Sequence, residues 1–167
     1  MSERAVPTVA PTIAAAVGAA DMATIRGLFL EYRAWLGVDL CFQDFDAEVA
    51  CLPGAYAPPG GGLWLARGGG GVLAGCIGLR PQEGGAGEMK RLWVRPAFRG
   101  CGLGRRLAGM CIDGARAAGY HCLRLDTLKQ MAAAHALYRD LGFREIPAYY
   151  ANPLDQVRYL ELDLTSH

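Results

Sequence analysis

One segment restricts the fold more than any other: three glycines at alternate positions, between a strand-like run and a helix-like run. It extends from Val94 to Leu107, with a proline at 96 and glycines at 100, 102 and 104. Glycine has no Cβ, so backbone N–H groups can approach one anion closely. The first N–H groups of a helix also bind anions, and the helix dipole favours negative charge there. The segment therefore predicts a cradle for a diphosphate where a strand ends and a helix begins.

Three arginines, Arg99, Arg105 and Arg106, are expected to place fixed positive charge around this cradle. The alternative is a plain glycine-rich turn with surface arginines. A dinucleotide fingerprint needs a third glycine where Arg105 or Leu107 stands, and no Gly-Lys-Ser/Thr of a P-loop is present. A dinucleotide-dependent oxidoreductase is therefore a minor alternative.

The first half of the chain predicts helices followed by a hairpin. Asp21 is expected to cap a helix that ends at Gly37, and a shorter helix is expected over residues 44–52. Two apolar runs flank the four glycines at 68–71, which predicts a β-hairpin. Thirteen of the 23 glycines lie in the range from Gly54 to Gly87, and we interpret them as residues that form turns.

The second half alternates between strand and helix patterns. Strands are predicted over residues 88–94, 123–126 and 159–164, and helices with apolar stripes from Leu103 to Gly114 and from Ala134 to Leu141. Gly119 and Gly142 stand where C-terminal caps belong. This order predicts a mixed sheet with helices packed on it.

Length and charge fit a single domain over residues 1–167, with residues 1–18 as an N-terminal tail that leads into the first strand. The net charge of +1 argues against a nucleic-acid partner bound through a broad basic face, and no apolar run is long enough for a membrane span. The six cysteines show no CxxC pair, so we expect reduced thiols in the cytoplasm. The histidine spacing predicts no metal site.

Two motifs carry a family resemblance. Arg99-x-x-Gly102-x-Gly104, preceded by Leu92-x-Val94-x-Pro96, resembles the acyl-CoA motif of the GNAT superfamily of N-acyltransferases. The segment from Ala134 to Phe143 is similar to the family's A-x-x-L-Y-x-x-x-G-F motif. The resemblance implies an α+β fold: a twisted, mostly antiparallel mixed sheet of about six to seven strands with about four helices, splayed between two central strands.

The resemblance also implies chemistry without a metal: acetyl-CoA donates an acetyl group to a primary amine, which attacks directly in a ternary complex. Tyr138 is then the general acid for the leaving thiolate, the alternative being a core aromatic. Glu88 is the candidate general base, the alternative being an ion pair with Lys90 or Arg91. The expected cofactor-binding residues are Leu92, Trp93, Val94, Arg99, Gly100, Cys101, Gly102, Leu103, Gly104 and Arg105.

The strand period places Glu88 on one face with Lys90, Leu92 and Val94. Cys101 is interpreted as a loop residue, with a nucleophilic thiol as the alternative. Met131 stands where the family often has an Asn that contacts the cofactor, which puts that contact in doubt.

The acceptor is expected to be a small-molecule or peptide amine, and a homodimer is expected from the architecture. An acidic and aromatic lining would suit a cationic amine, and solvated loops are the alternative. The candidate lining comprises Cys41, Phe42, Gln43, Asp44, Phe45, Asp46, Glu48, Tyr149, Tyr150 and Asn152. A non-catalytic acyl-CoA sensor is the alternative function.

Overall fold

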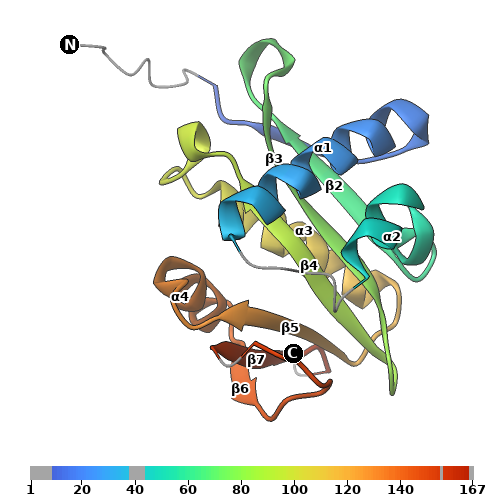
Figure 1. Cartoon of the computed structure of the whole chain (residues 1–167), viewed down its shortest axis with the longest axis vertical. Helices are drawn as coiled ribbons and strands as arrows, with labels where there is room; N and C mark the ends of the chain where they lie inside the picture. The colour runs from blue at the N-terminus through green and yellow to red at the C-terminus, as the bar shows by residue number, and fades with distance from the viewer. Residues whose placement is uncertain (1–8, 38–43, 155, 166–167) are drawn as a thin grey trace.

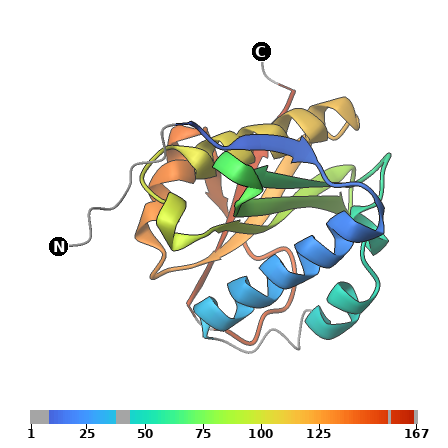
Figure 2. The same cartoon turned by 90° about the horizontal axis from the view of Figure 1, so that it is seen from above.

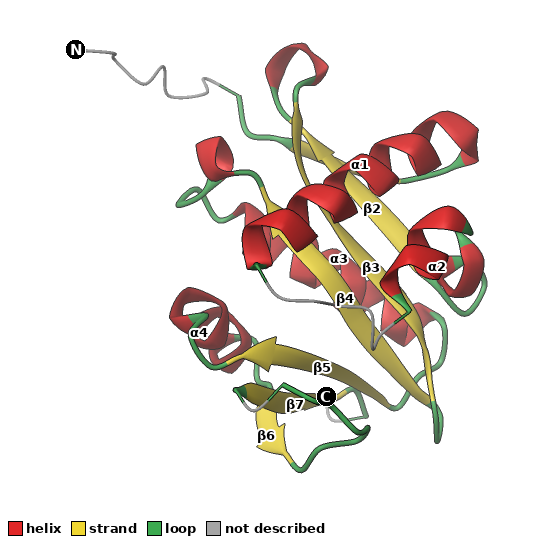
Figure 3. Cartoon of the chain, in the orientation of Figure 1, coloured by secondary structure: helices red, strands yellow, loops and turns green. Residues whose placement is uncertain are grey.

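The computed structural model describes residues 9–37, 44–154 and 156–165. Helices lie on both sides of one open, twisted sheet (Figures 1 and 3). Within these ranges the sheet has seven strands in the order β1-β2-β3-β4-β5-β7-β6, accompanied by four α-helices, which confirms the predicted fold class. The elements are β1 (Thr12–Ala15), α1 (Gly18–Leu36), α2 (Phe45–Ala50), β2 (Gly62–Arg67), β3 (Leu73–Gln82), β4 (Ala86–Val94), α3 (Leu103–Ala117), β5 (Cys122–Leu128), α4 (Ala132–Asp140), β6 (Arg144–Ile146) and β7 (Val157–Asp163).

Helix α1 starts four residues earlier than the sequence pattern predicts. It begins at Gly18, and Asp21 lies in its first turn, where its Oδ2 accepts a hydrogen bond from the Val17 N–H at 2.9 Å. The predicted end is confirmed, because Gly37 adopts a left-handed φ of 72° that a glycine takes without strain. Strand β1 lies inside the segment expected as a tail, and residues 1–8 of that segment are outside the described ranges.

The middle of the sheet is antiparallel, and the predicted hairpin around the four glycines is confirmed. β2 pairs with β3, and β3 pairs with β4. β4 and β5 then run parallel, joined by α3, as a crossover connection requires.

The pairing of β4 with β5 is short, and this opens the sheet. Their register comprises Ala86 with Cys122, Gly87 with Leu123 and Glu88 with Arg124. Beyond Glu88 the two strands diverge, and Figure 1 shows β5, β7 and β6 set apart from β2–β4. The predicted splay is thus present, with Glu88 at its vertex.

A β-bulge in β4 changes which side chains share a face. The register with β3 shifts between Cys76 and Gly78, and Arg91 has a φ of +59°. A bulge inserts one extra residue, so the alternation of faces is reset beyond it. Leu92 and Val94 consequently pack with the α3 core, and the prediction that they share a face with Glu88 and Lys90 is wrong.

The two faces of the sheet carry separate cores. Figure 2 shows α1 and α2 on one side and α3 and α4 on the other. The α1 face of the core includes Ile25, Leu28, Phe29 and Trp93. The α3 face is built on Leu103, Leu107, Cys111 and Ala115, and α4 adds Tyr138. A site between β4 and β5 is therefore walled by helices from both layers.

The C-terminal part confirms the helix predicted from Ala134 to Leu141: α4 covers Ala132–Asp140, and Gly142 follows with a φ of 98°. The three-residue strand β6 was not predicted, because it has no buried apolar alternation. No helix in the described part of the chain has both the length and the apolar character that a membrane span needs.

Candidate active site

The splay between β4 and β5 contains two connected hollows. The smaller is a cavity of about 50 Å³, which we call the splay cavity; it is lined by residues 89–92 of β4, residues 125–128 of β5, Tyr32 and Tyr138. The larger is a groove of about 830 Å³, which we call the cradle groove; it extends over the glycine turn. Leu36, Leu92, Leu128 and Met131 line both hollows, so the groove and the cavity adjoin one another.

The glycine turn forms the predicted cradle. Gly100 and Gly102 have φ angles of 82° and 81°, and Gly102 is the N-cap of α3 without any side-chain cap. The first backbone bond of the helix runs from the Arg106 N–H to the Gly102 carbonyl, so the N–H groups of residues 103–105 are left for a ligand. These backbone donors at a positive helix end fit a diphosphate.

The three arginines do not surround the cradle equally. Arg99 and Arg105 line the groove, whereas the Arg106 Nη1 donates to the Pro11 carbonyl at 2.7 Å. Arg105 forms an exposed ion pair with Asp140 at 3.1 Å. Two of the three predicted arginines, Arg99 and Arg105, therefore border the cradle, and Arg106 does not.

Arg99 is held by aromatic rings. Its guanidinium carbon lies 5.0 Å from the Trp35 ring and 5.1 Å from the Trp93 ring, and its Nε donates to the Val94 carbonyl at 3.0 Å. Stacking of this kind is favourable for a planar cation. The side chain thereby joins the end of α1 to the rim of the cradle groove.

Leu92, Trp93 and Val94 border the cradle groove, as do all the predicted cofactor-binding residues except Cys101. The thiol of Cys101 is exposed and lies 2.9 Å from the Phe98 carbonyl. Met131, at the position where the family often has Asn, lines both hollows. Thr127 lines the splay cavity, and its Oγ1 is 3.9 Å from the Met131 Sδ. Gln130 also lines the groove.

Tyr138 projects from α4 into the splay cavity. Its ring is 7% exposed and packs edge-on against Phe143 with a centroid distance of 5.7 Å. Burial is the main cause that raises its pKa above the ordinary value, and the nearby Tyr32 and Asp126 add to it. The phenol therefore keeps its proton at neutral pH. Tyr138 is thus a core aromatic, as one of the two sequence alternatives predicts, and it also lines the splay cavity.

Glu88 lies at the vertex of the splay, one side chain behind the cavity lining. It is 1% exposed, and it accepts hydrogen bonds from Arg80 Nε and from the Tyr149 hydroxyl, each at 2.7 Å. Lys90 Nζ is 4.0 Å from its second oxygen. The carboxylate is thus fixed and charge-paired, and Lys90 separates it from the cavity.

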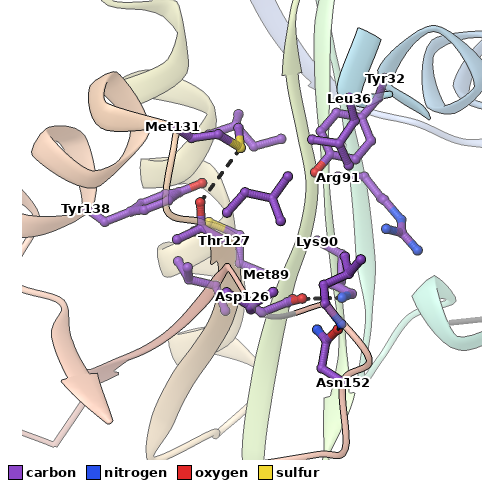
Figure 4. Close-up of a pocket in the computed structure, with 15 residues that line it drawn as sticks. Tyr32, Leu36, Met89, Lys90, Arg91, Asp126, Thr127, Met131, Tyr138 and Asn152 are labelled. Carbon is purple, nitrogen blue, oxygen red and sulfur yellow. Dashed lines mark hydrogen bonds and ion pairs between the residues drawn. The ribbon is translucent and has the colours of Figure 1, made fainter. Parts of the chain in front are cut away.

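Lys90 and Asp126 face one another across the cavity (Figure 4). Their ion pair measures 2.9 Å, and the Tyr150 hydroxyl donates to the other Asp126 oxygen at 2.5 Å. Burial alone would raise the pKa of Asp126, but Lys90 and the Tyr150 hydrogen bond hold it below its ordinary value. Asn152 in turn donates to the Tyr150 oxygen at 3.0 Å.

The acceptor-side expectation is met in part. Tyr149, Tyr150, Asn152 and Glu48 join this buried polar network, and Asp46 is on an exposed part of α2. Cys41, Phe42 and Gln43 lie outside the described residues. No sequence motif points to Tyr32 or Asp126 as site residues. The available signal for Asp126 was its position: it is a charged residue in the otherwise mostly apolar strand β5.

Comparison with known proteins gives one consistent result. The model of the acetyltransferase (GNAT) family matches residues 25–143. An uncharacterised N-acetyltransferase from Schizosaccharomyces pombe is 38% identical over 146 residues, which cover 87% of this chain and 90% of the relative. An acyl-CoA N-acyltransferase structure from Klebsiella pneumoniae superposes with a TM-score of 0.72 at 28% identity, covering 92% of this chain and 97% of that one.

A structure from Salmonella typhimurium shows an acetyltransferase with its cofactor acetyl-CoA. It superposes with a TM-score of 0.69 at 26% identity and covers 95% of this chain and 96% of that one. The family match spans the glycine cradle, the splayed strands and Tyr138. The chain therefore belongs to the GNAT family of acetyltransferases, enzymes that take their acyl group from an acyl-CoA.

Proposed function

We propose that this protein transfers the acetyl group of acetyl-CoA to a small-molecule or peptide amine by direct attack in the splay cavity. The observation that carries the proposal is the continuity of the two hollows. The N–H groups at the start of α3 suit a diphosphate, and the groove leads along residues 92–94 to a cavity walled by Tyr138.

The residues divide the chemistry as follows. The free backbone edge of β4 beyond Glu88 hydrogen-bonds the pantetheine amides, since β5 no longer pairs with it. Amine nitrogen forms the new C–N bond as the C–S bond breaks. Tyr138 supplies the proton that the leaving thiolate takes up, and Glu88 receives the amine proton through an intervening water molecule.

Release of CoA thiol tests the proposal over a panel of a polyamine, free amino acids, a lysine-containing peptide and an aminoglycoside. Transfer to at least one amine above the rate of acetyl-CoA hydrolysis is expected. Tight CoA binding without any turnover would instead identify the sensor module, and no CoA binding would refute both functions.

The cradle makes a prediction about affinity. Gly102→Ala should weaken CoA binding about tenfold, because alanine disfavours the left-handed φ of 81° by roughly 1–2 kcal/mol, so the free turn relaxes and CoA binding must restore the cradle conformation. Gly109→Ala is the matched control: it lies in the same helix, is equally uncrowded and needs no left-handed φ. Calorimetry should find an unchanged Kd for it. Equal affinities of the two variants would remove the cradle from the proposal.

The proton acceptor makes a second prediction. Glu88→Gln should lower kcat/KM for the amine by about a hundredfold, because glutamine accepts no proton. The exposed Glu83 on the β3–β4 turn offers the control Glu83→Gln, which should behave as wild type. If Glu88→Gln keeps the wild-type kcat/KM for the amine and Asp126→Asn loses it, the base is Asp126.

A further inference from the structure

Tyr32 is a second phenol in the splay cavity, on the wall opposite Tyr138. It continues the buried stripe of α1, three residues beyond Phe29, and projects where the sheet has opened. Figure 4 shows Tyr32 and Tyr138 on opposite sides of the cavity, with their hydroxyl groups turned toward the space between them. The two phenols are close enough for Tyr32 to help raise the pKa of Tyr138.

The ring of Tyr32 is held in place by the bulge in β4. Beyond Arg91 the strand turns Trp93 toward α1, and the Tyr32 and Trp93 rings meet edge-on with a centroid distance of 6.2 Å. Trp93 is fixed in its turn by a hydrogen bond from its Nε1 to Glu31 at 3.3 Å. A ring locked in this way presents its hydroxyl at a defined point of the cavity.

Among the described residues, this hydroxyl has no hydrogen-bond partner. Burial raises the pKa of Tyr32 to about 12, partly offset by the charge of Arg91, so the phenol is neutral at physiological pH. A neutral phenol in a cavity both accepts and donates hydrogen bonds. Lys90 and Asp126, by contrast, already bind one another.

We propose that Tyr32 binds the acceptor: its hydroxyl oxygen accepts an N–H of the attacking amine and turns the nitrogen lone pair toward the thioester carbon. This inference rests on the proposed acetyl transfer. It gives the two phenols separate tasks: Tyr32 orients the nucleophile from the α1 wall, and Tyr138 serves the leaving sulfur from the α4 wall. The acceptor amine enters on the α1 side, and the acyl-CoA enters through the cradle groove.

Tyr32→Phe tests the inference, because it removes the hydroxyl and leaves the ring against Trp93. One neutral hydrogen bond is worth about 0.5–1.5 kcal/mol, so kcat/KM for the amine should fall about two- to tenfold. The KM for the amine should rise, whereas the Kd for CoA, the rate of acetyl-CoA hydrolysis and Tm should stay at wild-type values. The amine is the best acceptor from the panel, with acetyl-CoA saturating.

Tyr56→Phe is the matched control. Tyr56 is also a tyrosine of the α1 face, 2% exposed, with a buried hydroxyl that lacks a hydrogen-bond partner in the described part of the chain, and it lines neither the splay cavity nor the cradle groove. Its loss should leave the amine KM unchanged.

Three outcomes would overturn the inference. An unchanged amine KM in Tyr32→Phe would show that the hydroxyl does not touch the acceptor. If Tyr32→Phe lowers kcat without changing the KM for the amine or for acetyl-CoA, and Tyr138→Phe stays active, Tyr32 would be the proton donor to the leaving group. Absence of transfer by the wild type to every amine would refute the proposed function together with this inference.

Discussion

Tyr138→Phe should reduce kcat by about 10²–10⁴-fold, the range that a positioned proton donor contributes. The substitution removes one oxygen and keeps the ring that packs against Phe143, so folding and CoA affinity should change little. Because burial raises the pKa of Tyr138, the acid form persists through the neutral range and wild-type activity should not decline between pH 7 and 9 on its account. Single-turnover thiol release measures the effect.

The control for Tyr138→Phe is a calorimetric measurement of its Kd for CoA. An unchanged Kd for CoA in Tyr138→Phe would place the loss in the chemical step, since the cofactor then binds as before. A kcat within threefold of wild type would exclude the phenol as proton donor and leave Tyr138 as a core aromatic only.

Glu48→Ala should destabilise the fold by about 3–5 kcal/mol, because it removes the carboxylate that pairs with the buried Arg91 and with the half-buried Arg80, although Arg80 keeps its bond to Glu88. Glu48 accepts from Arg91 at 3.0 and 3.2 Å and from Arg80 at 3.2 Å. The side chains of Glu48 and Arg91 are 9% and 3% exposed, so water replaces the lost bonds poorly. Urea unfolding with an unchanged m value measures the difference.

Asp46→Ala supplies the comparison on the same helix. Its ion pair with Arg33 at 2.8 Å is exposed, with 76% of the Asp46 side chain accessible, and such pairs contribute less than about 1 kcal/mol. A Glu48→Ala loss no larger than that of Asp46→Ala would show that the network does not anchor α2 to the sheet.

Local patterns were reliable wherever a single segment carried the information. The left-handed positions at Gly100 and Gly102, the caps at Gly37 and Gly119 and the apolar stripes of α3 and α4 all follow from neighbouring residues. Strand β6 and the start of α1 were missed, because one has no apolar alternation and the other begins on small residues without a capping side chain.

The site itself depended on distant contacts. The bulge at Arg91 has no local signal, since arginine is not a residue that favours a positive φ, and it reversed the predicted faces of Leu92 and Val94. The pairing of Glu88 with Arg80 and Tyr149 joins three separate segments. The sequence spacing of these three residues does not predict that they meet.

The sequence by itself determined the anion cradle, the family and the position of Tyr138, because backbone freedom at glycine and helical periodicity are local properties. Tertiary structure alone decided that β4 and β5 part at Glu88, that Glu88 is enclosed behind Lys90, and that Tyr32 faces Tyr138. The physical reason is that strand register and packing arise from contacts between residues far apart in the chain, so they exist only once the whole sheet has formed.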